Sequence, residues 1–202
     1  EALLHIPRER GGDVGQLDAM NYGFDENQRI QLIPDSDGDL WDLDWPVCMV
    51  NFDDAQAYCK WYTNRTGQTW RLPYEAEWEK AARGSEGEKY PWGDQDPSCE
   101  VAVIKDKKGR SCGVKKRRTH HNKGKTLPVK SRPAGRYGLF DMIGNAEEWT
   151  ADWYSFSYYA ETPTEGWVGP EGPLDGSTRA LRGGSFYGSS SDGVRASYRY
   201  YG

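Results

Sequence analysis

Helical periodicity is confined to two neighbouring stretches of this chain, and this limits the folds open to it. The first stretch is residues 51–67, "NFDDAQAYCKWYTNRTG". Its apolar side chains recur at the spacing of one helix face, at Ala55, Tyr58, Cys59 and Tyr62. Asp53 or Asp54 can cap its start, and Gly67 stands where a helix commonly ends. The pattern predicts a helix of about four turns.

The second helical stretch, "RLPYEAEWEKAARG" at residues 71–84, has equally clear boundaries. Pro73 precedes it, and two glutamates lie in its first turn, where the helix dipole favours negative charge. Arg83 and Gly84 close it. We therefore expect two consecutive helices.

The rest of the chain is punctuated by glycine and proline. With 24 Gly and 11 Pro, tight turns and short strands are the elements that fit. "PVCMV" at residues 46–50 predicts a short strand, "YGLFDMIGNAEEWTADWY" a buried turn followed by a strand, and "STRALRGGSF" a strand that two glycines interrupt. Two helices and short β segments predict a loop-rich α+β fold.

The length of 202 residues predicts a single domain, 1–202, with two departures from it. Residues 1–45 are acidic and irregular. Residues 105–132 form a basic insertion that carries 12 Lys or Arg and one acid, Asp106, on a chain whose net charge is −5. We interpret this insertion as a solvated surface loop, because no nucleic-acid motif surrounds it. Nucleic acid is therefore not an expected partner, and no stretch is apolar enough for a membrane span.

The four cysteines leave two interpretations open. Pairing Cys48 with Cys59 and Cys99 with Cys112 is one, and unpaired thiols are the other. No C-x-x-C pair is present and histidines are few, which argues against a zinc site.

Four segments in a fixed order together resemble the formylglycine-generating-enzyme (sulfatase-modifying factor) domain family. They are "VNFDDAQAYCKW", "RLPYEAEWEKAARG…YPWGD", "YGLFDMIGNAEEWTADWY" and "RALRGGSF". The resemblance implies a variant of the C-type lectin fold, with two helices packed on short twisted antiparallel sheets.

The resemblance also sets an expectation about catalysis. Enzymes of this family hold copper through two cysteines just after the "GGS" motif, because Cu(I) favours soft thiolate ligands. The segment that follows Ser185 here is "FYGSSSDGVRASYRYYG", which contains no cysteine, and Gly188 stands about where the first would be. We therefore predict that the chain is not an enzyme and binds no copper. A metal-dependent oxidase of the family is the less favoured alternative.

A calcium site is the metal site that the resemblance implies. Asp141 and Glu148 would supply carboxylates, and Gly144 and Ala146 main-chain carbonyls, which are the hard oxygen ligands that Ca²⁺ takes. The alternative is that these carboxylates only hydrogen-bond the turn.

The C-terminal segment has the residue types of a paratope, Tyr, Ser and Gly. The residue types at its candidate positions, Tyr, Ser, Gly and Asp, can each be reached from an asparagine codon by changing only the adenines of that codon. In this it resembles the variable proteins of diversity-generating retroelements, whose C-terminal positions are rewritten by a reverse transcriptase. The predicted variable, ligand-binding residues are Tyr187, Gly188, Ser190, Asp192, Gly193, Tyr198, Tyr200 and Tyr201.

The interpretation that follows is a ligand-binding protein with a diversified, solvent-exposed site. Its partner would be a protein or a cell-surface ligand of unspecified identity, and a surface-displayed or virion-associated location would suit it. The alternative is an accessory or regulatory domain of the same family.

Overall fold

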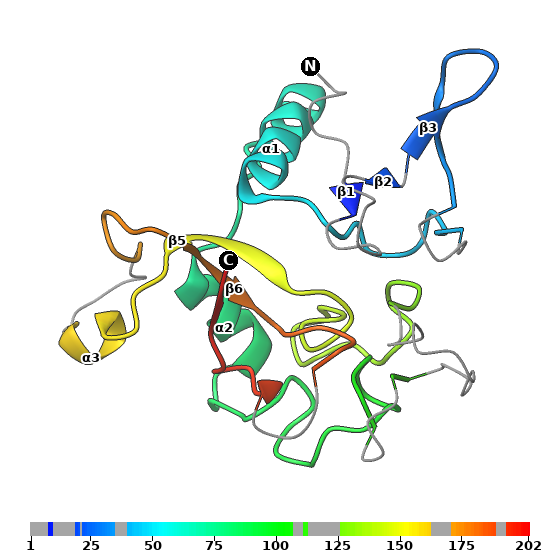
Figure 1. Cartoon of the computed structure of the whole chain (residues 1–202). Coiled ribbons are helices and arrows are strands. Elements are labelled where there is room, and N and C mark those ends of the chain that lie inside the picture. Colours follow the sequence, from blue (N-terminus) through cyan, green and yellow to red (C-terminus); the bar gives the residue numbers. More distant parts are fainter. Residues whose placement is uncertain are drawn as a thin grey trace. The chain divides into compact units, whose positions relative to one another are not determined.

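The computed structural model describes most of the chain, in two compact units (Figure 1). The described residues are 8–9, 19–20, 22–34, 40–106, 111–112, 126–162, 171–188 and 193–202. The units comprise residues 1–70 and 71–202, and each is treated by itself below. Most of the basic insertion lies outside the described residues, and the prediction of a single domain stays a prediction.

The first unit contains two short antiparallel strand pairs. Strand β1 (Arg8–Glu9) pairs with β2 (Ala19–Met20), and β3 (Tyr22–Phe24) pairs with β4 (Ile30–Leu32). The predicted strand at residues 46–50 is wrong, since this segment forms no strand. Met49 has a φ of 62°, which lies in the left-handed region and breaks an extended backbone.

Helix α1 (Phe52–Thr66) confirms the first predicted helix, but its cap differs from the expected one. The N-cap is Asn51, whose side chain accepts a hydrogen bond from the backbone N–H of Asp54 at 2.8 Å. The Asp54 carboxylate in turn accepts a bond from the backbone N–H of Asn51 at 3.1 Å, so the two residues form a capping box. Gly67 ends the helix in the left-handed conformation, as expected.

The second unit is built on a three-stranded antiparallel sheet with the order β5-β6-β7 (Figure 1). Its strands are Glu148–Trp153, Arg179–Arg182 and Tyr200–Tyr201. Helix α2 (Glu75–Arg83) contacts β5 and β6, and the one-turn helix α3 (Tyr158–Glu161) follows β5. This mixture of helix and small antiparallel sheets confirms the predicted α+β class.

Pairing within the sheet brings together two of the four segments that carry the family resemblance. Glu148 lies opposite Arg182, and Trp149 lies opposite Leu181. On the other side of β6, Leu181 lies opposite Tyr200. Trp149 and Trp153, both on β5, are partly exposed.

The hydrophobic core of the second unit draws on segments far apart in sequence. Its buried residues are Trp78, Ala82, Tyr90, Ala102, Ile104, Cys112, Met142, Ile143, Val194 and Ala196. Trp92 stacks on Tyr90 with the ring centroids 5.0 Å apart. Because Val194 and Ala196 belong to the core, the C-terminal segment is part of the fold.

One of the two cysteine pairings is present. Cys99 and Cys112 form a disulfide, whereas Cys48 and Cys59 are free thiols. The bridge closes a loop whose ends lie 13 residues apart, and the sulfur of Cys112 is enclosed in the core. Within the part of the chain that the structure describes, no helix is both long and apolar enough to cross a bilayer.

Reduction of the Cys99–Cys112 disulfide should destabilise the second unit. A cross-link that closes a loop of this length restricts the unfolded chain and contributes about 3 kcal/mol. We expect the double variant Cys99→Ala/Cys112→Ala to lose about this much in urea unfolding, and reductant to have the same effect on the unmodified protein. The variant Cys59→Ser, which alters a free thiol, is the control. An unchanged urea midpoint in reductant would contradict a stabilising role for the bridge.

Candidate functional site

The glycine pair after β6 directs the C-terminal segment against a neighbouring turn. Gly183 and Gly184 have φ values of 88° and 68°, a region that other residues enter at a cost. A Cβ atom on Gly183 would lie 3.1 Å from the carbonyl oxygen of Met142 and 3.3 Å from the Trp78 ring. The N–H of Gly144 donates to the Gly183 carbonyl at 2.9 Å. The two glycines therefore allow a turn and a close backbone approach that a larger residue would strain.

The residues just after the glycines are held at several points. The N–H of Phe186 donates to the carbonyl of Asn145 at 3.1 Å, and the hydroxyl of Ser111 donates to the carbonyl of Phe186 at 3.1 Å. The N–H of Lys105 donates to the carbonyl of Gly188 at 3.0 Å. The intervening Tyr187 is 49% exposed, so this aromatic side chain stands on a fixed backbone.

Tyr187 also has a cationic neighbour. The ammonium nitrogen of Lys105 lies 3.2 Å from the centroid of the Tyr187 ring, a cation–π contact. Lys105 belongs to the basic insertion, so at least this residue of it contributes to the surface around the C-terminal segment.

The last ten residues alternate between core and surface. Val194 and Ala196 have no exposed surface, whereas Tyr198 is 38% and Tyr201 is 64% exposed. Tyr200 is partly buried, and its hydroxyl donates to the carbonyl of Gly193. Burial, together with the negative charge of nearby Glu147, raises the pKa of Tyr200 to about 12.

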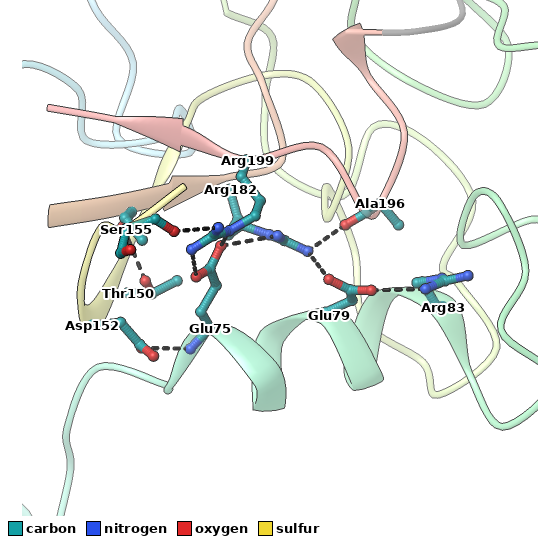
Figure 2. Close-up of polar contacts among 10 residues, drawn as sticks. Glu75, Glu79, Arg83, Thr150, Asp152, Ser155, Arg182, Ala196 and Arg199 are labelled. Atoms are coloured by element: carbon teal, nitrogen blue, oxygen red, sulfur yellow. Dashed lines mark hydrogen bonds and ion pairs between the residues drawn. The ribbon is translucent and has the colours of Figure 1, made fainter. Parts of the chain in front are cut away.

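Beneath this segment lies a buried network of arginines and carboxylates (Figure 2). Arg182, from β6, has no exposed side-chain surface, and its guanidinium donates to Glu75 at 3.0 Å and to Glu79 at 2.6 Å. It also donates to the carbonyl of Ala196 at 2.6 Å. The guanidinium therefore joins α2, β6 and the C-terminal segment.

Arg199 joins the same network through Glu75 (Figure 2). It forms a two-pronged pair with Glu75, through N–O contacts of 2.7 and 2.8 Å, and donates to the carbonyl of Ser155 at 2.7 Å. Asp152 accepts from the N–H of Glu75 at 2.6 Å and so caps the start of α2 from a distant strand. Burial raises the pKa of Asp152 to about 6, although the bond from the Glu75 N–H opposes the rise.

The roles of Glu75, Glu79 and Asp152 were not predicted from the sequence. We read the first-turn glutamates of α2 only as partners of the helix dipole. Yet Glu75 and Glu79 share the helix face of Trp78 and Ala82, because positions three, four and seven residues apart lie on one side. Glutamates among core-facing positions were the signal that could have indicated buried arginine partners.

The predicted calcium residues lie on a strained turn that leads into β5. Asp141 has a φ of 55°, and its carboxylate accepts from the N–H of Lys130 at 2.7 Å. The carboxylate of Glu148 accepts from the indole N–H of Trp78 at 2.6 Å. Burial, and then the charge of Asp141, raises the pKa of Glu148 to about 7. Two carboxylates therefore lie near each other, and Glu148 forms no ion pair with a described residue.

The structure describes six of the eight predicted variable residues. Tyr187, Tyr198 and Tyr201 are exposed, and Gly188, Gly193 and Tyr200 are partly buried. Ser190 and Asp192 lie outside the described residues. The assignment of all eight residues to a ligand site stays a prediction.

Breaking the buried network should cost far more than breaking a surface ion pair. Removing one partner leaves an uncompensated buried charge, so we expect Arg182→Met to lower the free energy of unfolding by about 3 to 5 kcal/mol. The matched control is Arg71→Met, which breaks an Arg71–Glu77 pair of 2.7 Å whose side chains are half exposed. That pair should contribute less than about 1 kcal/mol. Equal losses in the two variants, measured by denaturant unfolding, would show that the network does not hold the fold.

Two solved structures are similar to this chain. PvdO from Pseudomonas aeruginosa is 21% identical, with a TM-score of 0.63 over 97% of this chain and 64% of that one. Variable protein 1 of Treponema denticola is 32% identical, with a TM-score of 0.49 over 65% of this chain and 41% of that one. The likeness to PvdO shows the fold, a C-type lectin fold of the formylglycine-generating-enzyme type, as predicted.

A relative known as an enzyme corrects one prediction. The formylglycine-generating enzyme of Streptomyces coelicolor is 42% identical over 142 residues, which cover 70% of this chain and 42% of the relative. This chain thus spans less than half the length of that relative. We predicted from the missing cysteine pair that the chain is not an enzyme, and that prediction is wrong, because the match places the chain among relatives that are enzymes.

The family model agrees with the four motifs. Residues 34–200 match the model of the sulfatase-modifying factor enzyme 1-like domain, which is well over half of the chain. The family model, the fold, the four ordered motifs and the similarity to the Streptomyces coelicolor enzyme agree. The chain belongs to the formylglycine-generating-enzyme (sulfatase-modifying factor) domain family.

Proposed function

We propose that this chain binds a ligand on the surface formed by its C-terminal segment, residues 185–202. The observation that carries the proposal is the alternation within that segment. Exposed tyrosines stand at residues 187, 198 and 201, while Val194 and Ala196 between them are buried in the core. The proposal concerns binding, which enzymes and binding proteins share.

The tyrosines suit binding because little freedom is lost when a partner contacts them. A tyrosine offers a large amphipathic surface with only two side-chain torsions. Here the rings are also supported by neighbours, since Tyr201 lies 4.9 Å from Tyr154 and Tyr198 lies 4.6 Å from Tyr200, between ring centroids. The backbone beneath them is anchored by Arg199, which is paired with Glu75. A preorganised surface of this kind lowers the entropic cost of association.

We further propose that the exposed positions are diversified, as in the variable proteins of diversity-generating retroelements. The buried residues of the segment would then be constant and the exposed ones variable. Deep sequencing of the coding DNA for residues 185–202, in many cells of one population, tests this. We expect substitutions at adenines in the codons of Tyr187, Tyr198 and Tyr201, with the codons of Val194 and Arg199 unchanged. Substitutions spread evenly over all codons would refute diversification.

We also propose that the turn before β5 binds Ca²⁺ through the carboxylates of Asp141 and Glu148 and the main-chain carbonyls of Gly144 and Ala146. Two neighbouring carboxylates, one of them without a cationic partner among the described residues, fit a hard cation. The described residues contain no group of three or more His, Cys, Asp or Glu side chains that could hold a metal, so the main-chain carbonyls are needed. The ion would neutralise the charge of the turn.

Replacing the exposed tyrosines should leave the fold intact. We expect the triple variant Tyr187→Ser/Tyr198→Ser/Tyr201→Ser to lose no more than about 1.5 kcal/mol of unfolding free energy, because surface changes usually stay within about 0.5 kcal/mol each. The comparison is Arg199→Met, in the same segment, which should lose about 3 kcal/mol because the buried carboxylate of Glu75 loses its two-pronged partner and keeps only Arg182. Thermal and urea melts measure both. A triple variant that fails to fold would mean that these tyrosines are structural, against the proposal.

Chelation should lower the melting temperature if the turn binds calcium, because a ligand bound only to the folded state stabilises it. Glu148→Gln and Asp141→Asn keep hydrogen-bond acceptors but remove charge, so both should abolish the response to chelator and to added Ca²⁺. A melting temperature that changes neither with chelator nor with added Ca²⁺ would refute the calcium proposal.

The buried carboxyl group of Glu148 should make the stability of the metal-free protein depend on pH. The pKa of Glu148 is raised from 4.5 to about 7 on folding. Between these values the folded state therefore binds more protons than the unfolded state, and stability falls as pH rises. Urea unfolding of the chelated protein across this range should show that fall, and Glu148→Gln should show less of it. Stability that rises with pH in the unmodified protein and not in the variant would contradict the burial of this carboxyl.

A further inference from the structure

The first unit contains a cavity that the C-terminal surface does not account for. Its volume is about 120 Å³, enough for a small headgroup. Its lining is mostly aromatic and aliphatic, and consists of Tyr22, Leu32, Trp41, Asp42, Leu43, Trp45, Pro46, Val47 and Cys48.

Two tryptophans meet in this cavity because of a tight turn between them. The N–H of Trp45 donates to the carbonyl of Asp42 at 3.1 Å, which closes the turn. The rings of Trp41 and Trp45 then lie 5.7 Å apart between centroids, with an angle of 66° between their planes. Tyr22 and Leu32, which are opposite each other on β3 and β4, add lining from a separate hairpin. Three aromatic rings from two segments therefore line one small space.

The charge at the cavity is negative. Among the described residues, Asp42 is the one carboxylate in the lining; it accepts a bond from the N–H of Leu43 at 2.7 Å, and no described residue forms an ion pair with it. The other ionisable groups in the lining stay neutral, because burial raises the pKa of Cys48 to about 11 and that of Tyr22 above its usual value. In the sequence, residues 30–59 contain seven aspartates and no lysine or arginine.

We propose that this cavity binds a quaternary or methylated ammonium group. Aromatic faces attract such cations without needing hydrogen bonds, and a single carboxylate at the cavity complements the charge. An anion would be repelled by Asp42. A sugar is the competing occupant, and the experiment below separates it from the cation by comparing choline with methyl glucoside.

The test compares choline with its neutral carbon isostere, 3,3-dimethylbutan-1-ol, on the full chain. Indole N–H signals of Trp41 and Trp45, assigned in ¹⁵N-labelled protein from Trp→Phe variants, report binding at this cavity. We expect choline to shift both signals saturably, and the isostere to bind at least several-fold more weakly. Equal binding of the two would mean a merely apolar cavity, and no saturable shift with choline would leave no ammonium site; either result overturns the proposal.

Matched variants locate the effect. Asp42→Asn should weaken choline binding roughly three-fold or more while binding of the isostere is unchanged, and Trp45→Leu should weaken it roughly two- to thirty-fold. Trp61→Leu replaces an exposed tryptophan of α1 outside the cavity lining and should leave choline binding unchanged. Circular dichroism checks that each variant is folded. Choline binding that survives Asp42→Asn intact, or a preference for methyl glucoside over choline, would also overturn the proposal.

Discussion

The buried guanidinium of Arg182 is the interaction on which the second unit depends. A charge without solvent contact is tolerated only if its partners satisfy it, and here Glu75, Glu79 and a main-chain carbonyl do so. Because these partners come from α2 and the C-terminal segment, the network sets the position of the helix against the sheet. Arg199 repeats the arrangement on Glu75 and holds the backbone just before β7. The surface that we propose for binding is therefore held in place by buried ion pairs.

Trp78 connects the buried arginine–carboxylate network to the turn that we propose as a calcium site. Its indole N–H donates to Glu148, and its ring lies 5.0 Å from the guanidinium carbon of Arg182 and close to Gly183. One buried side chain thus contacts the network, the glycine pair and the acidic turn. A change in the charge of Glu148 would alter its hydrogen bond with the Trp78 indole.

The arrangement separates what holds the fold from what faces a ligand. Along the C-terminal segment Val194 and Ala196 are buried and Arg199 pairs with Glu75, whereas the tyrosines at residues 187, 198 and 201 are exposed. A segment built in this way can change its exposed residues while its backbone path is kept by contacts with α2 and β6. In the first unit the acidic aromatic cavity is lined by other residues.

The sequence by itself determined the elements whose signals are local. The helices α1 and α2, the turn before β5, and the strands β5 and β6 follow from periodicity, caps and glycines within a few residues, and the four ordered motifs identified the family. A strand at residues 46–50 was predicted wrongly, because an apolar run does not reveal the left-handed backbone of Met49. Only the tertiary structure decided which cysteines pair and why charged residues lie on the core face of α2. The partners of Glu75 are 77, 107 and 124 residues away, and the burial of a polar group depends on such distant partners.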